Sequence, residues 1–289
     1  MKPGLLKKIG GLIFFMLMCV AELAGAQVAA VFDLTGTAQA IPGAGSPRNL
    51  RKGDLLNQGD TIATGESSNI ILRFDDGQIV ALTPKSRFTI SNYVYNSAEP
   101  AKSNVLLSLI QGGMRAVTGL IGKRNADSVS YRAAQATIGI RGTDASISTD
   151  SGLVSVVVHD GMLTFNLPGQ QPVSIPAGQG LINTPDGKTK SAPAAQIIAA
   201  LRQLAADQKA AASAPGATQA QKDAAAAAEH ATDNMIAALQ TTSSSSITSG
   251  ITAAANPPAA PGSTDTRDKN PNTNPLRSTG GGQQPPSNK

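Results

Sequence analysis

From Gln27 to about Thr189, apolar residues recur at every second position, in short runs that glycine, aspartate, asparagine or proline interrupts. Alternation of this kind places the apolar side chains on one face of a β-strand. Turn signals arrive at intervals of roughly ten residues, which is the spacing of a sandwich, a barrel or a β-solenoid. The pattern therefore predicts an all-β domain over residues 27–190, built as a compact β-solenoid or in a sandwich-like way.

Three segments of this region show how the strands are joined. The segment 28–41 predicts two short strands on either side of its central TG pair. The segment 69–84 predicts a hairpin with Asp76 and Gly77 in its tight turn, because glycine adopts a positive φ without a side-chain clash. The segment 104–122 is more continuous and suits a buried strand pair or a helix. Its GG pair favours the strand pair.

The run ATIGIRGTDASIS changes phase in its middle. Its apolar residues occupy even positions up to Ile140 and odd positions from Ala145 onward. Such a change turns every later side chain to the opposite face, unless a bulge or corner of the backbone absorbs it. Gly142 can adopt the conformation that a corner requires. The run is therefore predicted to be a strand that contains a register-shifting corner.

Arg141 lies at this predicted corner, where its guanidinium could bind a carboxylate or unpaired carbonyl groups. Asp127 and Asp144 are its candidate partners. We expect this structural role rather than a ligand-binding one. An Arg141→Ala variant would then lose about 1–3 kcal/mol of stability, because buried acceptors would be left unpaired.

The composition changes at Ser191. Two alanine-rich runs, separated by a Pro-Gly pair, predict a helical extension over residues 191–240. These helices have little apolar area, so they could dock on the β-domain, pair with each other or act as a spacer, including as a coiled coil. Residues 241–289 are rich in Ser, Thr, Asn, Gly and Pro and are predicted to be a disordered tail.

The N-terminus has the three parts of a secretory signal peptide. Lysines are followed by an apolar run that is too short to cross a bilayer, and then by an A-x-A site that ends at Ala26. The predicted cut lies between Ala26 and Gln27, and an uncleaved anchor is the alternative. Cys19, the only cysteine, lies inside this peptide. The mature protein is therefore expected in the periplasm or secreted, without disulfides and not integral to the membrane.

Charge and composition exclude some classes of partner. The formal net charge is +5, aromatic residues make up 3% of the chain and tryptophan is absent. Nucleic-acid binding needs a clustered basic face, ideally with aromatic side chains that stack on bases, so we expect none. Arg115, Lys123 and Arg124 do lie close together in sequence. They could form a solvated edge that prevents aggregation, or an interaction surface for an acidic partner or the cell wall.

No motif predicts catalysis, a cofactor or a metal site. His159 and His230 are the only histidines, and a metal site usually draws on several ligands. His159 precedes an Asp-Gly pair and is expected to be exposed in a turn between strands, and His230 is expected to be solvated. Asp75 and Asp76 could suggest paired carboxylates for acid–base chemistry. Their place in a tight hairpin makes a turn function the preferred interpretation.

Several motifs in order resemble the FecR domain of bacterial extracytoplasmic proteins. The resemblance covers roughly residues 28–188 and includes GDTIATG, FDDGQIVALTPKSRF, LLSLIQGGMRAVTGLIGKRN, ATIGIRGTDA and PAGQGLIN. The residues that carry its signature here are Thr137, Gly139, Arg141, Gly142, Thr143 and Asp144, with Asp76 and Gly77 in the hairpin.

The resemblance implies an all-β periplasmic domain that is used for interaction. In the best-known FecR-type regulators, this domain follows a sigma-factor-binding segment and one membrane span, and it relays the signal of an outer-membrane receptor. Only eight residues precede the apolar run here, so we expect no direct anti-sigma activity.

Two functions follow as expectations. The first is a non-enzymatic exported protein that binds an envelope partner, a receptor or a sensor, in signalling or regulation. The alternative is a structural envelope protein that binds peptidoglycan or another surface polymer. A hydrolase on a β-scaffold is a third, weaker hypothesis, since plausible catalytic groups are lacking.

Overall fold

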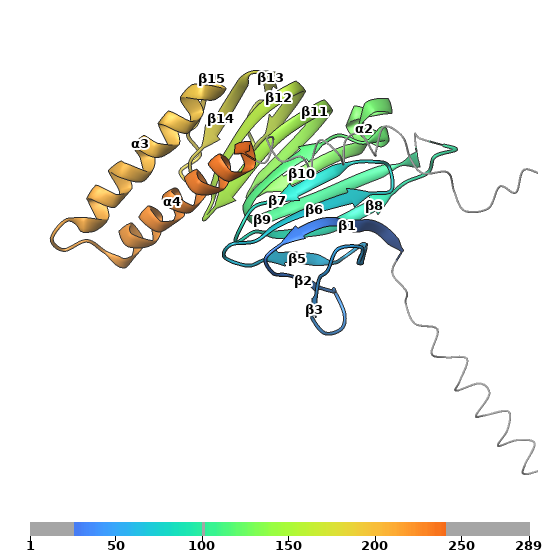
Figure 1. Ribbon diagram of the computed structural model, residues 1–289. Coiled ribbons are helices and arrows are strands. Elements are labelled where there is room, and N and C mark those ends of the chain that lie inside the picture. The colour runs from blue at the N-terminus through green and yellow to red at the C-terminus, as the bar shows by residue number, and fades with distance from the viewer. Residues whose placement is uncertain (1–25, 100–101, 241–289) are drawn as a thin grey trace, which may run out of the picture. The chain divides into compact units, whose positions relative to one another are not determined.

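The computed structural model describes residues 26–99 and 102–240, which fall within one compact unit (Figure 1). The predicted signal peptide, apart from Ala26, and the predicted disordered tail lie outside the described residues. The first eight strands are β1 (Gln27–Thr35), β2 (Ala38–Ile41), β3 (Arg48–Asn49), β4 (Leu55–Asn57), β5 (Thr61–Thr64), β6 (Asn69–Phe74), β7 (Ile79–Leu82) and β8 (Arg87–Val94).

The second half contains the long strands and the helices. They are β9 (Asn104–Val117), α2 (Leu120–Arg124), the 3-10 turn η2 (Ala126–Ser128), β10 (Val129–Ala133), β11 (Ala136–Asp150), β12 (Leu153–Asn166), β13 (Val173–Pro176), β14 (Gln179–Asn183), β15 (Thr189–Pro193), α3 (Ala194–Ser213) and α4 (Gln219–Gln240). The predicted boundary at residues 190–191 falls inside β15, and the helices begin at Ala194.

All fifteen strands belong to one hydrogen-bonded sheet that folds into two layers. In the first layer, β2, β5, β8, the first half of β9, β10, the first half of β11, the second half of β12 and β13 pair in this order. In the second layer, β4, β1, β6, β7, the second half of β9, the second half of β11, the first half of β12, β14 and β15 pair in this order. The three long strands therefore run through both layers.

One hydrophobic core lies between the layers. Phe88, Tyr131 and Phe165 of the first layer belong to the same buried cluster as Leu72 and Val156 of the second layer. Alternating side chains of both layers point into this space, as in a sandwich. The all-β prediction is confirmed, and the architecture is sandwich-like, with helices only after β9 and at the C-terminal end of the described chain.

Glycines mark the points at which the long strands bend. Gly112 of β9, Gly142 of β11 and Gly161 of β12 have φ values of +96°, +58° and +76°. Residues with a Cβ resist this conformation, so glycine lets a strand leave one layer and enter the other. The prediction of a strand pair over 104–122 is wrong, because β9 continues through its glycine pair as one bent strand and changes its neighbours there.

The other strand predictions are confirmed. β1 and β2 flank the TG pair, and β6 and β7 form the hairpin in which Gly77 has a φ of +80°. The phase change of the signature run is a register shift of β11 against β12, and it lies between Arg141 and Ala145. Each feature was visible in the sequence because it depends on residues that are close together in the chain.

The two long helices lie side by side and pack on the outer face of the second layer (Figure 1). α3 contacts β12, β14 and β15, whereas α4 contacts β9, β11 and β12. Leu153, Val157, Leu201 and Met235 belong to the small hydrophobic core of this contact. Of the three alternatives for the extension, the structure therefore shows both pairing and docking. No described helix is long and apolar enough to cross a membrane.

Small residues allow α4 to approach the sheet closely. A Cβ on Gly113 would lie 2.8 Å from the backbone oxygen of Asn234, so only glycine fits below the helix at this point. The hydroxyl of Ser148 donates a hydrogen bond to the carbonyl of Ala231 (3.1 Å), and that of Thr83 donates one to Oδ1 of Asn234 (2.8 Å). The sheet face below α4 is thus buried although it is polar, because its hydroxyl groups are paired.

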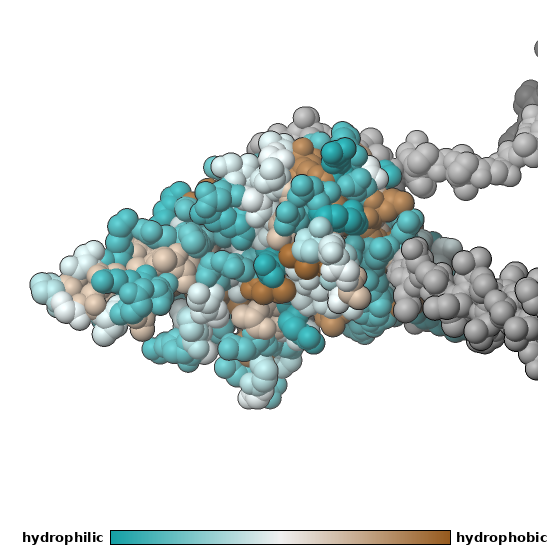
Figure 2. Space-filling view, turned by 90° about the horizontal axis from the view of Figure 1, so that it is seen from below, coloured by the Kyte–Doolittle hydropathy of each residue, from teal (hydrophilic) through white to brown (hydrophobic). Residues whose placement is uncertain are grey.

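The described part of the chain exposes few large apolar groups. On the face shown in Figure 2, hydrophobic residues form separate patches among hydrophilic ones. The exposed large hydrophobic side chains are Leu55, Val94, Ile110, Leu120 and Met162. Scattered residues of this kind are ordinary on a protein surface and do not indicate an interface by themselves.

Candidate functional site

The signature run ATIGIRGTDASIS forms a corner in β11. At this corner, β11 and the neighbouring strand β12 each contain a bulge. Gly142 of β11 and Gly161 of β12 both have positive φ, and a Cβ on Gly161 would lie 2.9 Å from the carbonyl oxygen of Arg141. Gly142 itself has open space around the position of a Cβ. The two bulges therefore fit into each other only because Gly161 has no side chain.

His159 lies next to this double bulge. The prediction of an exposed turn residue is wrong, because β12 continues through Asp160 and Gly161 as one strand. Nε2 of His159 lies 2.9 Å from the hydroxyl oxygen of Ser146. Burial and the nearby Arg115 guanidinium lower the pKa of His159, and the Asp144 carboxylate partly opposes this change.

An ion pair joins β9 to β11 beside the corner. Nε of Arg115 donates a hydrogen bond to Oδ1 of Asp144 (2.7 Å), and Nη2 donates one to Oδ2 (2.5 Å). Such a two-pronged pair fixes the geometry of both side chains. The candidate pairing of Asp144 with Arg141 is wrong. Arg115 reaches this carboxylate from the neighbouring strand.

The remaining signature residues hold the strand that follows the corner. Thr143 is buried, its N–H donates a hydrogen bond to the hydroxyl of Thr118 (2.9 Å), and its carbonyl accepts one from that hydroxyl (2.7 Å). Thr118 directly follows β9, so its side chain continues the contact between the two strands. Thr137 and Gly139 lie half-buried in the first half of β11, where they pair with β10 and β12.

Asp76 joins the β6–β7 hairpin to two distant parts of the chain. Its side chain is 1% exposed, and its Oδ1 accepts hydrogen bonds from the hydroxyl of Tyr93 (2.9 Å) and the N–H of Gln78 (3.0 Å). Burial and this carboxylate raise the pKa of Tyr93. Partial burial and the Asp76 charge also raise the pKa of Asp75.

The other oxygens of Asp76 hold the beginning of α2. Its carbonyl accepts a hydrogen bond from the N–H of Leu120 (2.8 Å), and its Oδ2 accepts one from the N–H of Ile121 (3.3 Å). The unpaired N–H groups at the start of a helix favour an acceptor of this kind. The hairpin turn thus positions a helix that lies 45 residues further along the chain.

α2 brings its basic last turn next to the corner. Lys123 and Arg124 of α2 and Arg141 of β11 are exposed and line one hollow of about 470 Å³, together with Asp127. Within the described part of the chain, none of these three cations has an ion pair. We call Lys123, Arg124, Asp127, Arg141 and Gly142 the corner surface. It carries three positive groups and one negative group, so it is suited to an anionic partner.

Arg115 does not belong to the corner surface. It is 5% exposed and bound to Asp144, so the sequence-based grouping of Arg115 with Lys123 and Arg124 is wrong. Arg115 points to the outer face of β9, whereas the two other residues lie on the helix that follows the strand. The closeness of these residues in the sequence did not reveal this difference. β9 ends at Val117, so Arg115 lies within the sheet and Lys123 and Arg124 lie on the helix after it.

Sequence reasoning also missed the contacts of His230, Tyr93 and Thr118. His230 is not simply solvated, since its Nδ1 lies 3.5 Å from Oδ2 of the buried Asp150. Tyr93 and Thr118 are bound to residues 17 and 25 positions away. No local pattern signals such contacts. Among the described residues, no group of three or more histidine, cysteine or acidic side chains could hold a metal ion.

A comparison with models of protein families agrees with the domain that the motifs suggested. Residues 60–164 match the model of the FecR protein family. No curated protein sequence matches the chain significantly.

Two solved structures of a candidate anti-sigma factor from Parabacteroides distasonis ATCC 8503 show a partial similarity to this chain. The first, at 1.65 Å resolution, is 13% identical, covers 50% of this chain and 64% of that chain, and has a TM-score of 0.38. The second, at 2.50 Å resolution, is 14% identical, covers 46% of this chain and 59% of that chain, and has a TM-score of 0.37. The chain thus spans less than two thirds of the length of these structures.

The family match begins just before β5 and ends within β12. It contains the β6–β7 hairpin, α2 and the corner with its double bulge, while β1–β4, β13–β15, α3 and α4 lie outside it. Residues 60–164 of this chain therefore form a FecR domain.

Proposed function

We propose that this chain is a non-enzymatic regulatory protein of the cell envelope that acts by binding a partner protein through the corner surface. The observation that carries the proposal is the grouping of Lys123, Arg124 and Arg141 around one hollow inside the FecR segment. Three cations without ion pairs attract acidic groups, and they set partner choice and association rate through electrostatic complementarity.

The backbone supports this role because it holds the cations in place. Asp76 fixes the start of α2, and the interlocking bulges fix Arg141 and Gly142. A rigid surface loses little conformational entropy when it binds, which favours specific recognition. The partner we infer is an envelope protein with an acidic loop or segment. Export by the signal peptide, with a location in the periplasm or outside the cell, is part of the proposal.

The test is capture from solubilised envelope with the chain from Gln27 to Lys289. A charge-reversed variant, K123E/R124E/R141E, removes the corner surface. The control variant K190E/R202E/K222E makes the same change of charge at three exposed residues outside the FecR segment. We expect the unchanged chain and the control variant to capture the same protein. The corner variant should no longer capture it. The captured protein is then purified and titrated against all three chains.

Two results would contradict the proposal. Equal capture of the same protein by the corner variant would show that binding uses another surface. Retention on purified wall sacculi that depends on the corner, without any captured protein, would favour the structural role in the envelope. Binding through the corner surface should also weaken as salt rises, because ions screen exposed charges over roughly 10 Å at 0.1 M ionic strength.

A further inference from the structure

One stripe of α4 changes its surroundings along the helix. In the second half of the helix, Ala231 and Met235 belong to the small core between the helices and the sheet. The stripe continues towards the start of the helix through Ala228, Ala224 and Ala220, because positions three or four apart share one helix face. These three alanines line a hollow. The first turns of α4 therefore present a face that the sheet does not fill.

The hollow has the size and the walls of a small-molecule site. Its volume is about 710 Å³, and it lies between α4, Leu204 of α3 and the tips of two hairpins. Leu153 follows the β11–β12 turn, and Pro185 lies in the β14–β15 turn. Ligand pockets typically enclose about 300–1,000 Å³, with mostly apolar walls and a few placed polar groups. The alanines of α4 leave this space open because their side chains are short.

Two carboxylates in the lining have no permanent positive partner among the described residues. Asp150 is 6% exposed, and it accepts hydrogen bonds from the hydroxyl of Ser151 (2.8 Å) and from Nε2 of Gln111 (3.2 Å). Its ion-pair partner is Nδ1 of His230 at 3.5 Å, and a histidine is charged only when it is protonated. Asp223 is exposed and accepts a hydrogen bond from a neutral glutamine of its own helix.

The other charges of the lining balance each other. Nζ of Lys188 lies 2.7 Å from Oδ2 of Asp186, so these two residues form an ion pair. The hollow therefore keeps an excess of negative charge, although the formal net charge of the chain is +5. A cationic ligand would be attracted by this hollow and not by the protein as a whole.

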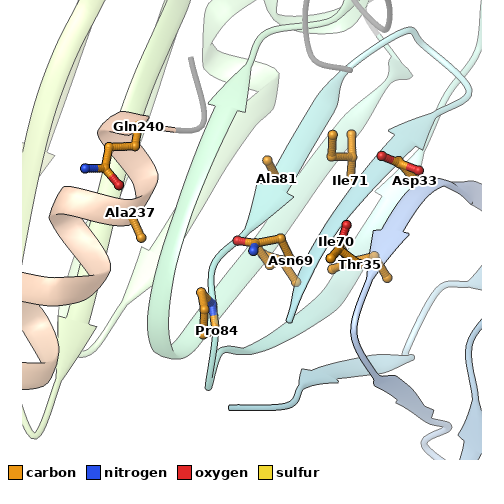
Figure 3. Close-up of a pocket in the computed structure, with 10 residues that line it drawn as sticks. Asp33, Thr35, Asn69, Ile70, Ile71, Ala81, Pro84, Ala237 and Gln240 are labelled. Carbon is orange, nitrogen blue, oxygen red and sulfur yellow. The ribbon is translucent and has the colours of Figure 1, made fainter. Parts of the chain in front are cut away.

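A smaller hollow at the C-terminal end of α4 lacks this excess charge. It has a volume of about 320 Å³ and lies between Ala237 and Gln240 of α4 and residues of β6 and β7 (Figure 3). Asp33 is the only charged residue among its described lining residues, and it lies 3.6 Å from Nζ of Lys52. Its charge is thus balanced, so this hollow does not select a ligand by charge.

The places of the two carboxylates along α4 set the length of the ligand. Asp150 lies beside His230, which follows Asp223 by seven residues in the same helix. Seven residues correspond to about 10 Å along a helix axis. A ligand that reaches both carboxylates needs positive groups at this separation. Between them it needs an apolar chain that contacts the alanine and leucine walls.

We propose that the hollow binds an aliphatic polyamine, with one ammonium group at Asp150 and another at Asp223. Each ammonium group would donate charge-assisted hydrogen bonds to its carboxylate. The alkyl chain between them would remove apolar surface of the hollow from water. The inference is independent of the proposed function, because no residue of the corner surface lines this hollow.

The test is calorimetric titration of spermidine into the chain from Gln27 to Lys289. Asp223→Asn removes one carboxylate, and Ala224→Leu fills part of the hollow. The matched controls are Asp207→Asn, at an aspartate of α3 that also accepts a hydrogen bond from a glutamine four residues earlier, and Ala226→Leu. All four positions are exposed, and neither control residue lines the hollow. Denaturation of each variant verifies that it is folded.

We expect the unchanged chain to bind one spermidine. Asp223→Asn and Ala224→Leu should each raise the dissociation constant at least about tenfold, because each loses a charge-assisted bond or the space for the chain. The two controls should bind like the unchanged chain, and an uncharged alkanediol of similar length should not bind.

Three results would overturn the proposal. The first is a failure of spermidine to bind the unchanged chain. The second is equal binding by all five chains, which would place the polyamine at another part of the protein. The third is binding of a tetralysine peptide but not of spermidine, with the same losses in Asp223→Asn and Ala224→Leu. That result would assign the hollow to a basic segment of a partner protein.

Discussion

The guanidinium of Arg115 and the carboxylate of Asp144 form a two-pronged ion pair between β9 and β11. Arg115 is 5% exposed, and its Nη1 is buried without a hydrogen-bond partner in the described chain. The pair lies next to the double bulge, so it joins β9 to β11, the strand that carries Arg141 and Gly142 of the corner surface.

This geometry predicts a strong response to the loss of one partner. Arg115→Met or Asp144→Asn should each destabilise the protein by about 3 kcal/mol, because the remaining group stays buried without its counter-charge. The measurement is chemical denaturation of the single variants and of R115M/D144N. The double variant should lose less than the sum of the two single losses. Additive losses would show that the two groups do not interact.

The two corner glycines should respond differently to the same substitution. Gly142→Ala meets no neighbour and should cost about 1–2 kcal/mol, the strain of a left-handed residue with a Cβ. Gly161→Ala adds a clash with the carbonyl groups of Arg141 and Gly142, so its loss should be clearly larger. Thermal and chemical denaturation check this order. A reversed order would contradict the interlocking of the bulges.

The exposed position of Arg141 changes the prediction made from the sequence. Arg141→Ala should alter the free energy of unfolding by no more than about 0.5 kcal/mol, because this side chain has no ion pair in the described structure. Denaturation of this variant beside R115M gives the comparison. A loss comparable to that of R115M would show that Arg141 holds buried acceptors, as its place in the sequence predicts.

His159 predicts a dependence of stability on pH. Its pKa is lowered in the folded state, so the unfolded chain takes up a proton first as the pH falls below about 6.5. The unfolded state then binds more protons, and stability must fall in the window between about 6.5 and the lower folded pKa. Denaturation measured from about pH 7.5 to about pH 5 should show this loss of stability.

The control for His159 is His159→Gln, which keeps a polar side chain but does not titrate. The difference in stability between the unchanged chain and this variant should shrink or change sign as the pH falls. Comparing the two chains removes the contribution of Asp75, whose raised pKa acts in the opposite direction at more acidic pH. A difference that is constant over the window would show that His159 titrates normally in the folded protein.

The contact of α4 with the sheet can be tested at Thr83 and Asn234. Thr83→Val keeps the shape of the side chain and leaves Oδ1 of Asn234 without its donor, which should cost about 1–3 kcal/mol. Asn234→Ala combined with Thr83→Val should restore part of this loss. Hydrogen exchange of α4 amides gives a local readout. Exchange of α4 that is unchanged in Thr83→Val would contradict the docking of the helix through this bond.

Local features of the structure could be predicted from the sequence. The hairpin at Asp76 and Gly77 and the corner at Gly142 depend on φ preferences and on alternation within a few residues. The sequence also showed that residues 27–190 are mostly β and that alanine-rich helices follow. These predictions needed no knowledge of which strand lies beside which.

Other predictions failed where the answer depended on neighbours in space. The segment 104–122 was expected to be a strand pair, but its glycines bend one strand, because each half finds different partners. His159 was expected in a turn, but a bulge in β11 matches one in β12 and lets the strand continue.

By itself, the sequence determined the β-rich character of the first part of this protein, its turns and the position of its corner, since these follow from side-chain alternation and backbone freedom. Only the tertiary structure decided that Arg115, not Arg141, binds Asp144. It also decided that Asp76 accepts hydrogen bonds from the start of α2. It also decided that α4 lies on a polar sheet face. The physical reason is that pairing, burial and charge depend on groups that the fold brings together from distant parts of the chain.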